Sequence, residues 1–397
     1  MSDLETFRAD TRAWLEENCP SGVRQPDAPP AAVWGGRRAE FYNDDAKVWL
    51  ERMAEKGWTV PTWPTEYGGG GLSNDEAKVL REEMQRIRAN PPLFSFGISM
   101  LGPALLEFAN EEQKKEHLTR IARGEIRWCQ GYSEPGAGSD LASLRTRAVR
   151  EGDHYVVNGS KIWTSDANHS DWIFCLVRTD PDVPKHNGIS FLLIDMETPG
   201  VSVSPIQLIS GASPFCETFF DDVRVPAANL VGVENDGWNI AKRLLQHERA
   251  MLGEGARSSA MGPRRKTLLE LARETLDAPE GRLPDAVIRD EMVQLEMDQA
   301  CYKSTFQRSA DAAKAGRGPG PETSMFKLYL SEMGQRGSDL RQRIVGAEGL
   351  GWSGAEFDAE EVQIAREWLY GRASSILGGT SEVQMNIIAK RVLGLPD

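Results

Sequence analysis

The order of hydrophobic patterns along the chain constrains its fold more than any single motif does. Over the first ~125 residues apolar side chains recur at helical spacing, for example in FYNDDAKVWLERMAEKGW and EEQKKEHLTRIARG. From Trp128 onward short apolar runs alternate with turns, and after NDGW the helical spacing returns and persists. Strands and helices do not alternate as they would in a doubly wound sheet. The order therefore predicts an α+β multidomain protein with a β domain between two helical domains.

The middle segment predicts a small barrel or sandwich, because evenly spaced strands separated by turns are typical of those folds. The runs DWIFCLVRT, GISFLLIDM, VSVSPIQLI and CETFFDDVRV have the length and composition of strands. HYVVNGSKIWTS divides into two short runs around Asn158 and Gly159, a dipeptide that predicts a hairpin turn. We place the domains at residues 1–126 (helical), 127–236 (β) and 237–397 (helical).

Charge and cysteine content argue against several classes of function. The formal net charge of -13 disfavours nucleic acid or an anionic membrane as the main partner. No apolar run approaches the length of a membrane span, and the acidic amphipathic segment MSDLETFRADTRAWLEENC lacks a secretory signal pattern. The five cysteines are scattered without a CxxC pair, which favours reduced thiols over disulfides or a zinc site. We therefore expect a cytoplasmic protein without a structural metal.

Two glycines precede the last predicted helix in the stretch ILGGTSEVQ. Ser381 followed by Gln384 fits a capping box at the start of that helix. Because Gly378 and Gly379 have no side chains, their backbone amides can approach a ligand closely, and a helix N-terminus favours negative charge. A simple glycine turn that leads into a capped helix explains the same residues.

One carboxylate lies on an apolar helix face. In WNIAKRLLQHERAMLGEG, Glu248 occupies the middle of an apolar stripe, and Arg249 points elsewhere on the helix. The stripe consists of Ile240, Leu244, Leu245, Met251 and Leu252. An unpaired buried carboxylate has a raised pKa, which suits a general base. An ion pair with a basic residue on another segment is an equally good explanation.

Two further motifs suit a planar heteroaromatic ligand. QGYSEPGAGSDLASL lacks the third glycine of a dinucleotide fingerprint, so it predicts a glycine-rich turn that carries the hydroxyls of Ser133 and Ser139. KIWTS places the Trp163 indole beside Thr164 and Ser165, which allows stacking on one side and hydrogen bonds to a ring edge. Taken alone, each motif is also explained by ordinary structure, a turn or a core tryptophan.

Taken together, the motifs are much more specific. YSEPGAGSD, VNGSKIWTS, FFDDVRVPAANLVGVENDGW and GGTSE, in this order and spacing, resemble the acyl-CoA dehydrogenase family across nearly the whole chain. The likeness extends to bacterial members that act on dicarboxylyl-CoA or steroid side-chain CoA thioesters. The resemblance implies an N-terminal helical domain, a middle β domain of barrel or sandwich type and a C-terminal four-helix bundle, with FAD as the cofactor.

The resemblance also implies which residues hold the FAD. Ser133 would bond the flavin ring, Ser139 would lie near the pyrophosphate and the CoA, Trp163 would lie against the isoalloxazine, and Ser165 would bond near N5. The GGTSE turn would bind FAD phosphate. The expected cofactor residues are Tyr132, Ser133, Gly138, Ser139, Trp163, Thr164, Ser165, Thr380, Ser381 and Glu382.

Many members of that family place the catalytic glutamate where this chain has Gly378. A second group places it on the first helix of the C-terminal domain, before an arginine, as Glu248 precedes Arg249. The resemblance thus implies that Glu248 removes the α-proton and that the Gly378 amide, with a flavin ribityl hydroxyl, stabilises the enolate-like oxygen. The β-hydrogen would leave as hydride to the flavin and give trans-2-enoyl-CoA, while Arg249 and Ser139 would contact the CoA thioester.

The expected partners are an acyl-CoA substrate, electron-transfer flavoprotein as electron acceptor, and further subunits. The regions where a neighbouring subunit would hold FAD read TLDAPEGRLPDAVIRDEM and RIVGAEGLGW, without the family's Arg-x-x-Phe or its glutamine before the glycines. We therefore expect a heterotetramer with a homologous chain, with a homo-oligomer as the alternative. A flavin oxidase or monooxygenase and a non-catalytic, FAD-completing subunit are the rival functions. NPPLFSFGISMLGP is expected to line the acyl pocket, but it does not name the acyl chain.

Overall fold

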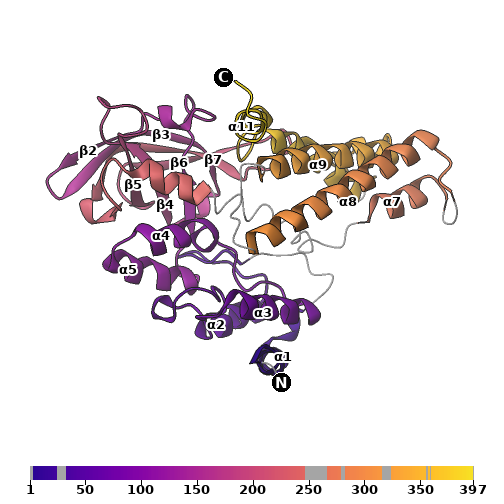
Figure 1. Ribbon diagram of the computed structural model, residues 1–397, viewed down its shortest axis with the longest axis horizontal. Helices are drawn as coiled ribbons and strands as arrows, with labels where there is room; N and C mark the ends of the chain where they lie inside the picture. Colours follow the sequence, from indigo (N-terminus) through magenta and orange to yellow (C-terminus); the bar gives the residue numbers. More distant parts are fainter. Residues whose placement is uncertain are drawn as a thin grey trace. The chain divides into compact units, whose positions relative to one another are not determined.

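The computed structural model describes residues 3–24, 33–245, 266–278, 282–314, 323–354, 356–357 and 359–396. These residues form two compact units (Figure 1). The first contains residues 3–206 and 214–245, and the second contains residues 207–213 together with those from 266 onward. The first unit therefore combines the N-terminal helices, the β domain and a helix over residues 237–245.

The N-terminal helices form where the apolar spacing predicts them. They are α1 (Asp3–Asn18), α2 (Asp44–Glu55), α3 (Asn74–Arg86), α4 (Gly102–Phe108) and α5 (Glu111–Ala122). Ser73 and Glu76 form a capping box at the start of α3, and Asn110 and Gln113 form another at the start of α5. A π-helical turn over Gly97–Leu101 leads into α4. No helix among the described residues is long and apolar enough to span a bilayer.

The β domain contains one mixed sheet. Its strands are β1 (Trp128–Gly131), β2 (Arg147–Glu151), β3 (His154–Ser165), β4 (Trp172–Arg178), β5 (Ile189–Asp195), β6 (Val201–Ile206), β7 (Phe215–Pro226) and β8 (Leu230–Val231). They pair in the order β6-β7-β3-β2-β4-β5-β8, and β1 runs parallel to β4. A single residue pair, Arg147 with Arg178, joins β2 to β4. The four runs that were predicted as strands are confirmed as β4, β5, β6 and β7.

Both faces of β4 and β5 are buried, which explains their continuous apolar sequence. One face packs against β3 and β7 in a core that includes Tyr155, Ile173, Leu192 and Val223. The opposite face packs against the helices of the first unit. That second core contains Leu105, Leu118, Phe174, Phe191, Ile240 and Leu244. The helices α4 and α5 and the helix over residues 237–245 therefore pack together on this face of the sheet.

The predicted hairpin turn at Asn158 and Gly159 is wrong. Both residues lie inside β3, and the turn between β2 and β3 is at Gly152, whose φ is +65°. The pairing of β3 with β7 shifts register between Val157 and Gly159, so the dipeptide forms a bulge. A Cβ at Gly159 would lie 2.7 Å from the Thr146 Cα, which explains the glycine. The run on each side continues to pair with β7, and this pairing overrides the local turn preference.

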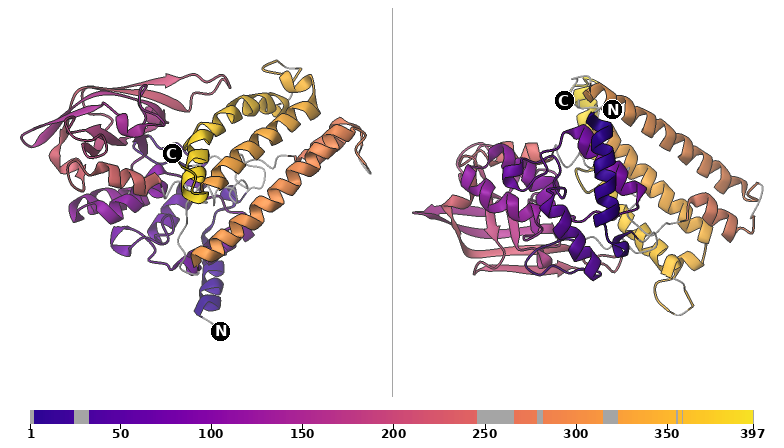
Figure 2. Two further views of the ribbon diagram at one scale, coloured as in Figure 1. Left: turned by 45° about the horizontal axis from the view of Figure 1, so that its top comes forward. Right: turned by 90° about the horizontal axis from the view of Figure 1, so that it is seen from below.

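The second unit is a helical bundle. Its helices are α7 (Leu268–Thr275), α8 (Ala286–Lys314), α9 (Thr323–Val345), α10 (Ala359–Gly371) and α11 (Ser381–Ile387), and a π-helical turn over Ile388–Val392 follows α11. Figures 1 and 2 show α8 and α9 side by side as two long helices, and α9 also packs against α7, α10 and α11. Leu295, Met333 and Leu340 lie in the shared core. The expected fold of helical, β and helical segments is confirmed.

Candidate functional site

The glycine-rich turn after β1 is closed on itself. Glu134 and Ala137 exchange two backbone hydrogen bonds of 3.0 Å, and both oxygens of the Glu134 carboxylate accept from backbone amides of the segment before β2. Gly136 and Gly138 are exposed, and a Cβ at either would meet nothing within 4 Å. A pocket of about 390 Å³ adjoins the turn and includes Gly136 in its wall. Open space therefore lies beside the turn, where a ligand can approach the backbone.

Three hydrogen bonds attach this turn to β3. The buried Lys161 ammonium donates to Glu134 Oε1 at 2.8 Å and to the Tyr132 carbonyl at 3.2 Å. The Ile162 amide donates to the Ser133 carbonyl at 2.9 Å. Ser133 is half-buried and Tyr132 is buried. The structure thus brings the YSEP turn and the KIWTS segment of β3 together.

Trp163 has an unusual backbone conformation. Its φ is +60°, in the left-handed region that bulky residues rarely adopt, and the register of β3 against β7 shifts between Lys161 and Thr164. The indole is 51% exposed and meets the Phe215 ring edge-on at 6.1 Å. Such strain is typical of functional sites. An exposed, fixed aromatic ring of this kind is suited to cover a planar ligand.

The residues after Trp163 divide between the two sides of the strand. Thr164 is fully buried, and its hydroxyl has no partner among the described residues. Ser165 is half-buried. The Thr164 hydroxyl is therefore buried inside the domain, whereas the exposed Trp163 and the half-buried Ser165 have side-chain surface open to solvent. The exposed indole, the neighbouring serine hydroxyls and the open glycines fit a flavin-like ring with a polar edge.

The GGTSE segment lies in the second unit. Gly378 and Gly379 have φ values of +63° and +89°, which glycine adopts without strain. Thr380, and not Ser381, is the N-cap of α11, because its hydroxyl accepts from the Val383 amide at 3.2 Å. The predicted N-cap is therefore wrong by one residue, and the predicted capping box with Gln384 does not form.

The Gln384 side chain is buried and points back toward the Gly379 carbonyl, with its Nε2 3.5 Å away, which is why it does not serve as the capping partner of Ser381. Ser381 is half-buried, and Glu382 is exposed. The Gly378 amide donates to no residue that the structure describes, so it can serve a bound ligand. Glu248 and Arg249 lie outside the described residues.

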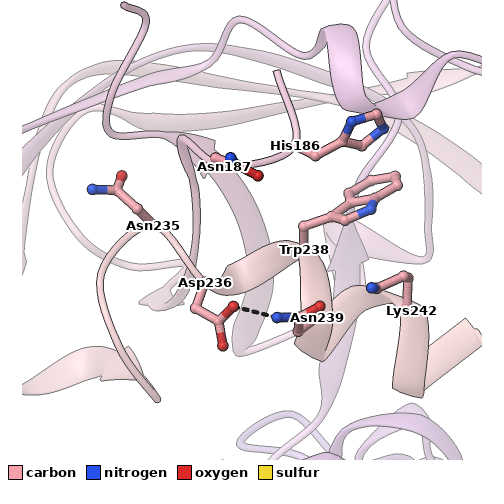
Figure 3. A pocket seen from close by; sticks show the side chains of 7 residues that line it. All are labelled: His186, Asn187, Asn235, Asp236, Trp238, Asn239 and Lys242. Atoms are coloured by element: carbon pink, nitrogen blue, oxygen red, sulfur yellow. Dashed lines mark hydrogen bonds between the residues drawn. The ribbon is translucent and has the colours of Figure 1, made fainter. Parts of the chain in front are cut away.

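Sequence reasoning missed a second pocket of about 450 Å³ in the first unit (Figure 3). The His186 and Trp238 rings lie 5.1 Å apart at 55°, and the Lys242 amine projects beside the indole. Asn187, Asn235, Asp236 and Asn239 complete the wall. The aromatic pair and the Lys242 cation suit a heteroaromatic base that carries phosphate, while Asp236 adds one carboxylate to the wall. The NDGW motif marks the start of the helix that carries Trp238, but His186 lies in a loop some fifty residues earlier in the chain. No local sequence pattern connects these two residues, so the pocket could not be predicted from the sequence.

The loop over residue 235 is held by hydroxyl groups. Thr179 Oγ1 bonds Ser190 Oγ at 2.7 Å and Asn235 Oδ1 at 2.6 Å, and the Asn235 amide donates to Ser190 Oγ at 2.8 Å. Asn235 has a φ of +70°, a conformation that asparagine tolerates. These bonds fix the start of the helix over residues 237–245 and therefore the position of Trp238.

Comparison with known proteins identifies three domain models in order along the chain. They are the acyl-CoA dehydrogenase N-terminal domain (residues 2–125), middle domain (129–223) and C-terminal domain (235–393). Acyl-CoA dehydrogenase IpdE1 of Mycobacterium tuberculosis (strain ATCC 25618 / H37Rv) is 37% identical over 400 residues, which cover 100% of this chain and 99% of that protein.

Two solved structures match over nearly the whole length. One is described as "Tcur3481-Tcur3483 steroid ACAD", with a TM-score of 0.75 and 31% identity, covering 100% of this chain and 98% of that one. The other is the ChsE4-ChsE5 complex from Mycobacterium tuberculosis, with a TM-score of 0.72 and 29% identity, also covering 100% and 98%.

Proposed function

From the premise that this chain belongs to the acyl-CoA dehydrogenase family of flavoprotein oxidoreductases, we propose that it uses FAD to convert an acyl-CoA thioester into trans-2-enoyl-CoA. The observation that carries the FAD assignment is the half-exposed Trp163, held in a strained conformation beside the Ser133 turn. Bound FAD would supply the acceptor for the hydride that leaves the β-carbon.

The chain's own residues perform the remaining tasks in this proposal. The Trp163 ring covers the flavin, while the hydroxyls of Ser133 and Ser165 bond its polar edge. The free amide of Gly378 donates to the thioester oxygen and stabilises the negative charge that develops there. Glu248 takes the α-proton, as its place on an apolar stripe and the absence of an acid at Gly378 together suggest.

The assignment of the base is tested with Glu248→Gln. The amide is nearly isosteric but cannot accept a proton, so flavin reduction by substrate under anaerobic mixing should slow by ~10²–10⁴ with FAD content unchanged. Gly378→Glu in that background supplies a carboxylate at the alternative position, and Gly378→Ala controls for the strain of a side chain at φ +63°. Near wild-type flavin reduction in Glu248→Gln would refute the base.

We propose that the pocket of His186 and Trp238 receives the nucleotide end of CoA, with the base against the indole and phosphate near Lys242. Trp238→Ala should then raise KM for an acyl-CoA at least tenfold. With the corresponding acyl-pantetheine, which lacks the nucleotide, wild type and variant should have the same KM. An equal KM increase for both thioesters would place the nucleotide elsewhere.

For assembly, we propose a hetero-oligomer with a homologous chain that supplies the missing FAD contacts. The family's donor motifs are absent from this sequence, and both solved structures described above are named as pairs of proteins. The chain expressed alone should bind FAD substoichiometrically, and co-expression with its homologous partner should raise the occupancy. Full FAD occupancy and turnover in a purified single-chain oligomer would instead support a homo-oligomer.

A panel of acyl-CoA thioesters and a panel of electron acceptors define the reaction further. One related structure is named as a steroid enzyme, so we propose steroid side-chain thioesters as the first substrates in a panel of acyl-CoAs. Electron-transfer flavoprotein is the proposed acceptor. Rapid reoxidation of the reduced enzyme by oxygen, in the absence of that acceptor, would favour an oxidase instead.

A further inference from the structure

One face of α9 carries three polar side chains, each one turn from the next. These are Lys327, Ser331 and Gln335, at positions i, i+4 and i+8. We call them the α9 polar row. All three point at the chain segment over residues 371–375, which lies between α10 and the GGTSE turn in the same unit.

The α9 polar row binds this segment mainly through its backbone. Lys327 Nζ donates to the Ser374 carbonyl at 3.0 Å. The Ser331 hydroxyl lies 2.9 Å from that carbonyl and 2.9 Å from the Lys327 carbonyl in its own helix, so its one proton is shared between the two acceptors. Gln335 Nε2 lies 3.3 Å from the carbonyls of Gly371 and Arg372, and 3.2 Å from the hydroxyl groups of the two serines that follow. Two donors that converge on one carbonyl determine its position more tightly than apolar packing does.

The held segment continues directly into Gly378. The amides of Ile376 and Leu377 both donate to the Ala373 carbonyl at 2.9 Å, so the chain between Ser374 and Gly378 is a closed turn. On the far side, Gln384 contacts the Gly379 carbonyl and Thr380 caps α11. The Gly378 amide is thus placed by bonded residues before and after it.

Lys327 is an unusual choice if its role is packing alone. Burial lowers the pKa of its ammonium group, with an opposing effect of the charge on Glu382. A leucine at this position would bury more apolar surface without that desolvation penalty. The ammonium donates to a backbone carbonyl, and such a charged hydrogen bond is stronger than one between neutral groups.

We propose that Lys327, Ser331 and Gln335 are positioning residues that hold the Gly378 amide where the thioester oxygen binds. This inference rests on the proposed function of Gly378. The row touches neither substrate nor cofactor in this proposal. It acts through the Ser374 carbonyl and the turn that follows.

The test compares wild type with Ser331→Ala, Lys327→Met and their combination in the assembled, FAD-loaded enzyme. A misplaced oxyanion donor lowers kcat by ~10-fold or more, because loss of such a donor altogether costs ~10²–10³. KM and FAD content should stay within about twofold, since only the transition state depends on the amide. Lys327→Arg retains a donor and should recover most of kcat. Lys303→Met, on the exposed surface of α8, is the matched control.

Hydrogen exchange provides a second measurement that does not depend on turnover. In the absence of substrate, the amides of residues 373–378 should exchange faster in the double variant than in wild type and in Lys303→Met. If the wild-type enzyme is active, and the double variant has the same kcat or the same amide exchange at residues 373–378, the positioning role is overturned while the proposed function stands. A wild-type enzyme whose flavin is reduced by none of the acyl-CoAs would overturn the proposed function, and this inference with it. Ser331→Ala removes only one hydroxyl, so it keeps the test valid if Lys327→Met misfolds.

Discussion

Lys161 Nζ lies 2.8 Å from Glu134 Oε1, and the two side chains are 0% and 9% exposed. Burial acts to raise the pKa of Glu134, but the Lys161 ammonium and the hydrogen bonds from Thr146 and Arg145 outweigh it and hold the pKa below its usual value. The Glu134 carboxylate therefore stays ionised inside the protein. Because Lys161 also bonds the Tyr132 carbonyl, the pair joins the two segments that carry Ser133 and Trp163.

Removing both members of this pair should cost less stability than the two single removals added together. Lys161→Met leaves the Glu134 carboxylate without its cation and should lower the unfolding free energy by about 3–5 kcal/mol. Lys161→Met combined with Glu134→Gln should lose clearly less than the sum of the single variants. Chemical denaturation measures this, with Lys78→Met in an exposed ion pair as a silent control. Simple additivity of the two single variants would contradict the coupling.

Substitution of Trp163 should separate stability from cofactor binding. Trp163→Gly removes a half-exposed ring but relieves a backbone conformation that tryptophan adopts at a cost of about 1–3 kcal/mol. We expect the apoprotein to unfold within about 1 kcal/mol of wild type, while the Kd for FAD rises at least tenfold, as expected for loss of an aromatic stacking partner. Titration of apoprotein with FAD measures the affinity. An unchanged Kd would show that the ring does not cover the flavin.

His117 should make the protein sensitive to mild acid. The side chain is 1% exposed between the Trp128 and Trp172 rings, and burial, with a smaller effect of the charge on Arg120, lowers its pKa to about 4. Between pH 6.5 and 4 the unfolded state takes up this proton and the folded state does not. Stability should therefore fall as the pH drops through this window, by up to about 3 kcal/mol.

The measurement for His117 is the unfolding free energy of wild type and His117→Leu across pH 4–7. In the leucine variant the unfolding free energy should fall less steeply between pH 6.5 and 4 than in wild type, whatever the absolute stability of the variant. Parallel curves for the two proteins would show that His117 is protonated in the folded state as readily as in the unfolded chain.

Glu83 should produce a second loss of stability at lower pH. Its carboxylate is 2% exposed and bonds three guanidinium groups, those of Arg12, Arg86 and Arg8, which lower its pKa to about 2. Its contribution is complete above pH 4.5 and is lost as the pH falls toward 2. Glu83→Gln should lower the unfolding free energy by about 1–3 kcal/mol at pH 7, and the difference from wild type should vanish near pH 2. A difference that is the same at both pH values would rule out the charge as the cause.

Local patterns in the sequence determined the element types and the positions of the main motifs. Helical spacing predicts α2 and α5 correctly, because side chains three and four residues apart lie on one face of a helix. Short runs separated by turns predict β4 to β7, although only β4 and β5 are buried along nearly their whole length and β6 has no fully buried residue. The motifs also locate Trp163 beside a glycine-rich turn, although the sequence does not reveal its left-handed backbone.

Tertiary structure decided whatever depends on partners far apart in the chain. Asn158 and Gly159 form a bulge because β7, some sixty residues later, pairs with both sides of that dipeptide. Lys161 and Glu134 are likewise far apart in the chain, by 27 residues, and the α9 polar row is up to 47 residues from Ser374. Side chains such as these look like ordinary surface residues in a linear pattern. Burial removes the water that would otherwise bind each of these polar groups, so each group needs a partner within the protein. Packing supplies that partner from a distant part of the chain.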